Sequence, residues 1–128
     1  MRRRLQIAVS VACLAVIGAG GRYAYGRETL RHTDPRDIYQ QVNRESFQGA
    51  LPDVPVTWAD LGKDWYGTTY FYADGTAAIE IDKGNVLSDR LLRGVVQHEA
   101  CHVAVGGSLG QGEDVHGATW QACMERFK

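Results

Sequence analysis

The residues best suited to chemistry lie in one short segment, His98-Glu99-Ala100-Cys101-His102, which fits the pattern His-Glu-x-x-His. On a helix, positions four apart share one face, so both imidazoles can reach a single metal ion. Neutral imidazole is a common zinc ligand, and a carboxylate beside the metal can take a proton from its bound water. The segment predicts metal-assisted hydrolysis, with His98 and His102 as ligands and Glu99 as the general base.

The sequence around this motif indicates that it lies against a protein core. Leu91 and Val95 lie on the helical stripe that leads to the two histidines, so the histidine face is expected to point inward. Glu99 shares a second stripe with apolar residues, where an acid is unexpected unless it has a function. Removal from water raises the pKa of a carboxyl, which suits a base that must later return a proton. The alternative, an exposed helix with two solvated histidines, leaves Glu99 unexplained.

A catalytic zinc ion usually has three protein ligands and one position open for water. The better candidate for the third ligand is His116, which follows a glycine-rich segment and directly precedes a predicted helix. Glu113 and Asp114 are close enough in sequence to supply an oxygen ligand instead. His32 lies near the N-terminus in a predicted linker and is interpreted as a surface residue.

The three cysteines lack the C-x-x-C spacing of a zinc site, so none is predicted to bind the metal. Cys13 lies in the apolar N-terminal run. Cys101 and Cys123 could form a disulfide in an oxidising compartment. They could equally be small buried residues on facing helices, and both interpretations stay open.

The elements that must position these residues begin with a helix and a strand. Asp34 is a suitable N-cap and Pro35 suits a first turn, so a helix is expected from there to about residues 48–49. Apolar residues at positions 54, 56 and 58 alternate in the manner of a short strand.

A hairpin is the next predicted element. Residues 68–72 have strong β propensity, Asp74-Gly75 is expected to form a two-residue turn, and Ala77–Asp82 alternates between two faces. Six aromatic side chains in or near these elements are predicted to pack in the core or across strands rather than to stabilise an oxyanion during hydrolysis. They are Tyr66, Tyr70, Tyr72, Trp58, Trp65 and Trp120.

Two further helices complete the predicted domain. Ser88 can cap a helix that runs through Val105 and ends at Gly106-Gly107, and the glycine-rich segment 106–112 is expected to be a loop. A final helix is expected from about residue 117 to residue 127. The order helix, strand, hairpin, helix, loop, helix indicates a compact α+β domain.

Length and charge limit the classes of function. The 128 residues are enough for one domain, and a net charge of −1 argues against binding of nucleic acid through bulk positive charge. Residues 1–21 contain three basic and no acidic residues, which leaves 11 basic and 15 acidic residues in the rest of the chain. No nucleic-acid partner is expected.

Residues 1–21 are predicted to be a signal peptide or an N-terminal membrane anchor. Arg2, Arg3 and Arg4 precede the 17 uncharged residues 5–21, which end in small residues. The run is at the short limit for a membrane-spanning helix, so cleavage after residue 21 or 26 and retention as an anchor are both open. A buried core helix is the less favoured alternative. Residues 22–33 are interpreted as a linker, and the rest of the chain is expected outside the cytoplasm.

His98-Glu99-x-x-His102, followed by a loop and His116-Gly117-x-x-Trp120, resembles the SprT-like zinc metallopeptidases, which are small gluzincin-like zincins. The resemblance extends over most of the predicted domain, residues 34–128, and includes the hairpin before the motif.

This resemblance implies a small zincin-like α+β domain in which His98, His102 and His116 bind zinc and Glu99 is the general base. It also implies that the strand Ala77–Asp82 lies at the edge of the cleft, where an extended substrate could pair with it. The expected activity is zinc-dependent hydrolysis of peptide bonds in proteins or peptides outside the cytoplasm. The alternatives are a catalytically weak zinc-binding scaffold and a membrane-tethered binding module without a metal.

Overall fold

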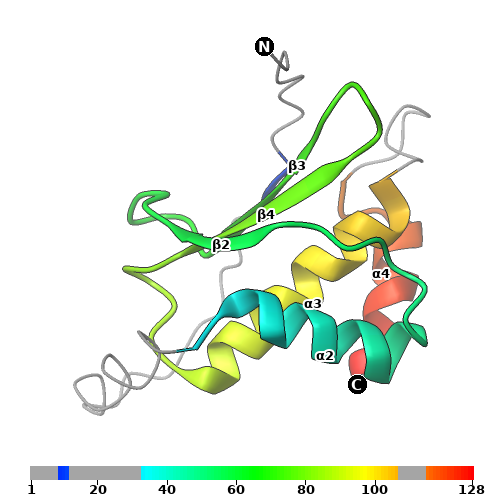
Figure 1. Ribbon diagram of the computed structural model, residues 1–128, viewed down its shortest axis with the longest axis horizontal. Coiled ribbons are helices and arrows are strands. Elements are labelled where there is room, and N and C mark those ends of the chain that lie inside the picture. The colour runs from blue at the N-terminus through cyan, green and yellow to red at the C-terminus, as the bar shows by residue number, and fades with distance from the viewer. Residues whose placement is uncertain (1–8, 12–32, 107–114) are drawn as a thin grey trace.

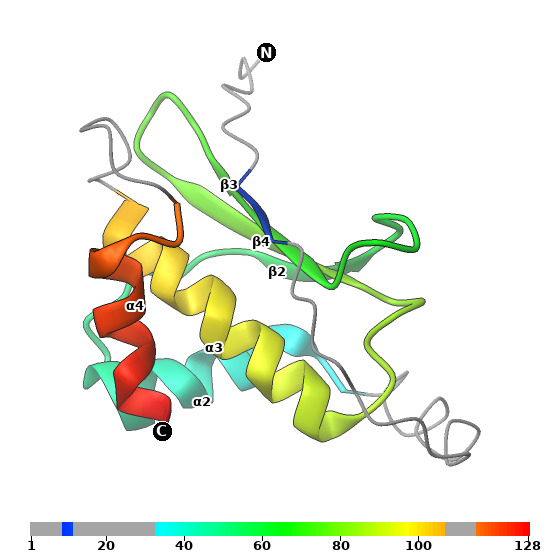
Figure 2. The same cartoon turned by 180° about the vertical axis from the view of Figure 1, so that it is seen from behind.

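The computed structural model describes residues 9–11, 33–106 and 115–128. Within these ranges all helices lie on one side of a single sheet, and α3 runs along that side below the strands (Figures 1 and 2). The mixed α+β architecture predicted from the sequence is confirmed. In chain order the elements are β1 (Val9–Val11), α2 (Pro35–Phe47), β2 (Val56–Ala59), β3 (Gly67–Phe71), β4 (Ala77–Asp82), α3 (Asp89–Val105), α4 (Ala118–Met124) and a 3-10 turn (Glu125–Phe127).

The sheet has the strand order β1-β3-β4-β2. The hairpin strands β3 and β4 are antiparallel, with Thr69 opposite Ile79, while β2 pairs with β4 in parallel. The expectation that Ala77–Asp82 lies at the cleft edge is therefore wrong, because β4 has a hydrogen-bonded neighbour on each side. Burial agrees with a central position, since Ile79 and Ile81 are fully buried under the helices.

The outer side of β3 pairs with β1 in antiparallel register, with Val9 opposite Thr69 and Val11 opposite Gly67. These three residues belong to the segment predicted as a leader, and its other residues lie outside the described ranges, as do the predicted linker up to residue 32 and Cys13. Among the helices of the described ranges, none is both long and apolar enough to cross a bilayer.

Side-chain caps define the helix beginnings predicted from the sequence. The carboxylate of Asp34 accepts a hydrogen bond from the backbone N–H of Arg36 at 2.9 Å. The hydroxyl of Ser88 accepts one from the backbone N–H of Leu91 at 3.1 Å. The α2 helix ends at Phe47, and its C-cap residue Gln48 adopts the left-handed conformation with φ of 53°. Both helices therefore begin where local capping chemistry predicts.

The connection between β3 and β4 is longer than the predicted two-residue turn. Five residues, 72–76, separate the strands, and Gly75 has a φ of +83° and donates its N–H to the carbonyl of Tyr72 at 3.0 Å. The Asp74 carboxylate accepts hydrogen bonds from both the backbone N–H and the hydroxyl of Thr76, at 3.0 and 2.6 Å. The N–H of Tyr72 also donates to the carbonyl of Thr76 at 2.8 Å, so a backbone hydrogen bond closes this connection across the two strands.

The C-terminal segment is joined to α3 by a disulfide between Cys101 and Cys123, whose Cα atoms are 5.8 Å apart. Of the two interpretations of this pair, the disulfide is the one observed. The predicted final helix is divided into α4 and a 3-10 turn. The Arg126 side chain donates to the carbonyl of Cys123 at 3.0 Å, so this carbonyl is satisfied where the α-helical pattern ends.

The core lies between the sheet and the helices, and the buried side of α3 lines it from Leu92 to His102. Its fully buried apolar side chains come from α2, the sheet, the segment before α3 and α3 itself, and the largest are Tyr39, Val42, Ile79, Ile81, Val86, Leu92 and Val96. Tyr66, Trp58 and Trp120 pack against this core and are partly buried, as predicted. This packing positions α3, which carries the His-Glu-x-x-His segment.

Candidate metal centre

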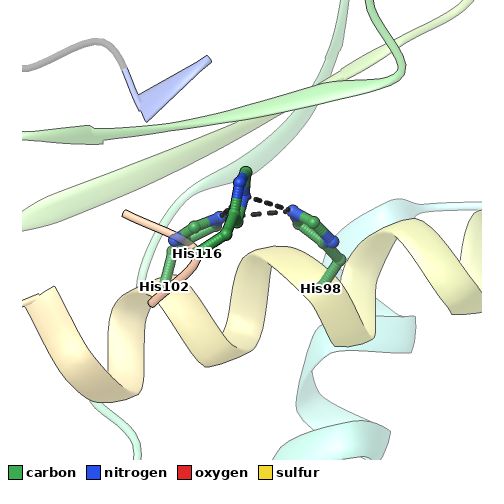
Figure 3. A group of neighbouring side chains, drawn as sticks. All are labelled: His98, His102 and His116. Atoms are coloured by element: carbon green, nitrogen blue, oxygen red, sulfur yellow. Dashed lines mark hydrogen bonds between the residues drawn. The ribbon is translucent and has the colours of Figure 1, made fainter. Parts of the chain in front are cut away.

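Three histidine side chains converge on one point (Figure 3). His98 and His102 lie one turn apart on α3, and His116 lies in the short segment before α4. The Nε2 atoms of His98 and His102 are 3.2 Å apart, and the Nε2 atom of His116 is 3.2 Å from the first and 3.1 Å from the second. The cluster is the group of His, Cys, Asp and Glu side chains in the described ranges that can hold a metal ion.

This triangle of nitrogens fits a tetrahedral metal ion. Zinc binds imidazole nitrogen at about 2.0–2.1 Å, which places the nitrogens of a tetrahedral site about 3.3 Å apart. The observed separations of 3.1 to 3.2 Å are close to that value on all three sides. Three nitrogen ligands leave a fourth tetrahedral position, which is the arrangement of a catalytic rather than a structural zinc site.

Burial keeps the helix-borne ligands in the form that binds metal. The side chain of His102 is fully buried and that of His98 is 7% exposed. Burial, together with the neighbouring imidazoles, lowers the pKa of each of these histidines to about 3. Both rings are therefore neutral at physiological pH, and neutral imidazole is the ligand form.

Glu99 is fully buried between α3 and the sheet. Burial raises its pKa to about 8, and a hydrogen bond from Thr69 opposes this shift. A divalent cation on the adjacent imidazoles would favour the charged carboxylate. Glu99 is thus a carboxyl group that can both hold and release a proton near neutral pH, as a general base must.

The metal-free protein is expected to be most stable near pH 6.5. Below this pH the unfolded chain protonates His98 and His102, whereas the folded chain excludes these protons down to about pH 3. Above the ordinary carboxyl pKa of 4.5 the unfolded chain loses the Glu99 proton, which the folded chain retains to about pH 8. Below about pH 6.5 the unfolded chain binds more protons at these three groups than the folded chain does, so the free energy of unfolding rises with pH. Above about pH 6.5 the folded chain binds more, because Glu99 keeps its proton, and the free energy of unfolding falls.

Thermal unfolding of the chelator-treated chain between about pH 4 and pH 9 measures this optimum. Glu99→Gln is the matched control, because it should remove the fall on the alkaline side and leave the acid side in place. A melting temperature that keeps rising from pH 6.5 to pH 8 would contradict the expectation.

Two buried side-chain atoms of the described residues have no hydrogen-bond partner there, and both belong to this site. They are Oε1 of Glu99 and Nδ1 of His102. Buried polar atoms without partners cost free energy and are rare in folded proteins. Both atoms therefore belong to the His-Glu-x-x-His segment, one to a ligand ring and the other to the carboxyl group next to His98.

Trp120 of α4 packs against all three imidazoles. Its ring centroid lies 4.5 Å from that of His98, 4.6 Å from that of His116 and 5.5 Å from that of His102. The indole N–H also donates to the backbone carbonyl of His98 at 3.4 Å. A rigid aromatic wall of this kind restricts the rotation of the ligand rings and excludes water from one side of them.

A comparison with family models bears on this arrangement. The model of the SprT-like family matches residues 35–128, which contain the three histidines, Glu99 and Trp120. The chain belongs to the SprT-like family. A search of curated proteins finds no match to the chain.

The SprT-like domain brings together the residues predicted from the sequence as its metal site. His116 reaches the two helix histidines, while Glu113, Asp114 and His32 lie outside the described ranges. Thr69 was missed, because a threonine in a strand with strong β propensity looks like an ordinary strand residue. Trp120 packs against the core as predicted, and it also contacts the three imidazoles, as its place in the His116-Gly117-x-x-Trp120 segment allows.

Proposed function

We propose that this SprT-like protein is a zinc metallopeptidase that hydrolyses peptide bonds in proteins or peptides outside the cytoplasm. The observation that carries the proposal is the combination of three converging imidazoles with a buried carboxyl group on the next residue, Glu99. A structural metal site has no need for such a carboxyl group, whereas hydrolysis needs a base beside the attacking water. Membership of the SprT-like family supports the same proposal.

In this proposal each residue has a separate task. His98, His102 and His116 would hold zinc, which supplies a Lewis acid that polarises the scissile carbonyl and acidifies a water molecule. Glu99 takes a proton from the attacking water and gives it to the leaving amine, so that the carboxylate is regenerated at the end of the cycle. Trp120 keeps the three ligand rings in place.

The location outside the cytoplasm has two supports. The basic start and apolar run of residues 1–21 are typical of an export signal. The disulfide between Cys101 and Cys123 is of the kind that persists in oxidising compartments. Fractionation of cells that express the full chain tests this location, and recovery in the cytoplasm with both thiols alkylatable without reductant would contradict it.

The peptidase proposal predicts a zinc-dependent activity of the purified full chain. We expect about one equivalent of zinc and hydrolysis of an unfolded protein such as casein, lost on chelation and restored by added zinc. Metal analysis and a casein assay check this expectation. Stoichiometric zinc without hydrolysis would indicate a zinc-binding scaffold, and less than about half an equivalent would indicate a binding module without a metal.

A further inference from the structure

Thr69 contacts the proposed general base from the opposite side of the core. It lies in β3, is fully buried, and its hydroxyl donates a hydrogen bond to Oε2 of Glu99 at 2.6 Å. The two residues are 30 positions apart in sequence. The contact is short for an O–H···O hydrogen bond, since such distances cluster at about 2.7–2.8 Å.

The close approach of β3 to α3 makes this contact feasible. Gly67 lies two residues before Thr69, on the same face of the strand. A Cβ atom at Gly67 would lie 2.8 Å from Cγ1 of Val95 and 3.1 Å from Oε1 of Glu99. Because a side chain at this position would collide with α3, glycine lets the strand come near enough for the Thr69 hydroxyl to reach the carboxylate.

The hydrogen bond makes the two oxygens of Glu99 different from each other. Oε2 accepts the hydroxyl of Thr69, and Oε1 has no hydrogen-bond partner among the described residues. The terminal torsion of a glutamate is soft, so a carboxylate without such a partner samples a wide range of orientations. Thr69 therefore fixes one of the two carboxyl oxygens and, with it, the orientation of the Glu99 carboxyl group between α3 and β3.

We propose that Thr69 is a positioning residue for peptide hydrolysis, and that its hydrogen bond to Oε2 fixes the orientation in which the Glu99 carboxyl group acts as the base. This inference rests on the proposed function. A purely structural role, in which the same hydrogen bond only ties β3 to α3, makes a different prediction. It would alter stability and leave the rate of the chemical step unchanged, whereas a positioning role lowers kcat in a folded protein that still contains zinc.

Four variants of the full chain separate these roles. Thr69→Val keeps the shape of the side chain without the hydroxyl, Thr69→Ser keeps the hydroxyl, and Thr69→Ala is a second hydroxyl-free variant. Thr68→Val is the matched control, since Thr68 is the buried neighbour on the opposite face of β3. We expect kcat of Thr69→Val to fall about 10- to 100-fold with KM and zinc content unchanged. Thr69→Ser should stay within about threefold of the wild type and Thr68→Val should match it.

Several results would overturn the proposal. They are a wild-type kcat in Thr69→Val, an equal loss in Thr69→Ser and Thr69→Val, and a loss of zinc in Thr69→Val. If Thr69→Val and Thr69→Ala both fail to fold, the hydroxyl is structural and the proposal fails as well. Each variant is therefore also assayed for zinc content and for its melting temperature.

A double-mutant cycle on the melting temperature tests the contact without any activity assay. Thr69→Val should lower the melting temperature of the wild type more than that of Glu99→Ala, because its hydrogen-bond partner is already lost in the second background. If the wild-type chain does not hydrolyse peptides, the proposed function is wrong. The double-mutant cycle still measures whether the side chains of Thr69 and Glu99 interact. Equal shifts in both backgrounds would mean that the two side chains do not interact, which overturns the inference itself.

Discussion

Replacing Glu99 with glutamine is expected to lower kcat for peptide hydrolysis by about 10³-fold or more, with zinc retained. Glutamine has nearly the same shape and can still accept the hydrogen bond from Thr69, but it cannot take a proton from water. The ligands are untouched, so metal content should stay near one equivalent. The variant should be at least as stable as the wild type at neutral pH, because burial disfavours the charged form of Glu99.

The measurement is a steady-state assay with casein or a fluorogenic peptide, accompanied by metal analysis and a melting curve. Glu80→Gln serves as the matched control, because Glu80 is a half-buried carboxyl on β4 that accepts a hydrogen bond from the hydroxyl of Tyr70 at 3.3 Å. Its activity should equal that of the wild type. If Glu99→Gln hydrolyses casein at the wild-type rate, the mechanism proposed above is wrong.

Replacing His116 with alanine is expected to weaken zinc binding by about 10²-fold or more and to abolish hydrolysis. Alanine leaves only His98 and His102, and one ligand of three contributes about 3 kcal/mol or more of the binding free energy. Since His116 lies outside α3 and is only partly buried, the fold should tolerate its loss. His116→Ala should therefore lower the zinc affinity strongly and change the melting temperature of the metal-free protein much less.

Competition with a chromophoric chelator measures the affinity, and His32→Ala is the control, since His32 is predicted to be a surface residue of the linker. An unchanged zinc affinity in His116→Ala would mean that another residue is the third ligand. In that event Glu113→Gln and Asp114→Asn would identify which of the two acidic alternatives takes the position.

The parts of the site that depend on local chemistry follow directly from the sequence. The pairing of His98 with His102 requires only that residues four apart share a helix face. The beginnings of α2 and α3 follow from side chains that bond to backbone groups two or three residues away. Burial of Glu99 was also predictable, because the apolar residues on its stripe place it against the core.

Other features depend on contacts between distant segments, which no local pattern specifies. The disulfide closes a separation of 22 residues, and the choice between a disulfide and two buried thiols required the relative placement of α3 and α4. The parallel pairing of β2 with β4 moved β4 from the predicted edge to the centre of the sheet. Hydrophobic alternation shows which face of a strand is buried and carries no information about its neighbours.

The metal centre itself combines both kinds of information. Residue types and spacing along one helix specify two ligands and a base, because side-chain direction on a helix is set by the backbone. The distance from His116 to these ligands, the wall formed by Trp120 and the contact of Thr69 with Glu99 arise from packing of α4 and β3 against α3. Such long-range packing is a cooperative outcome of the whole core, so these three features became visible in the folded chain.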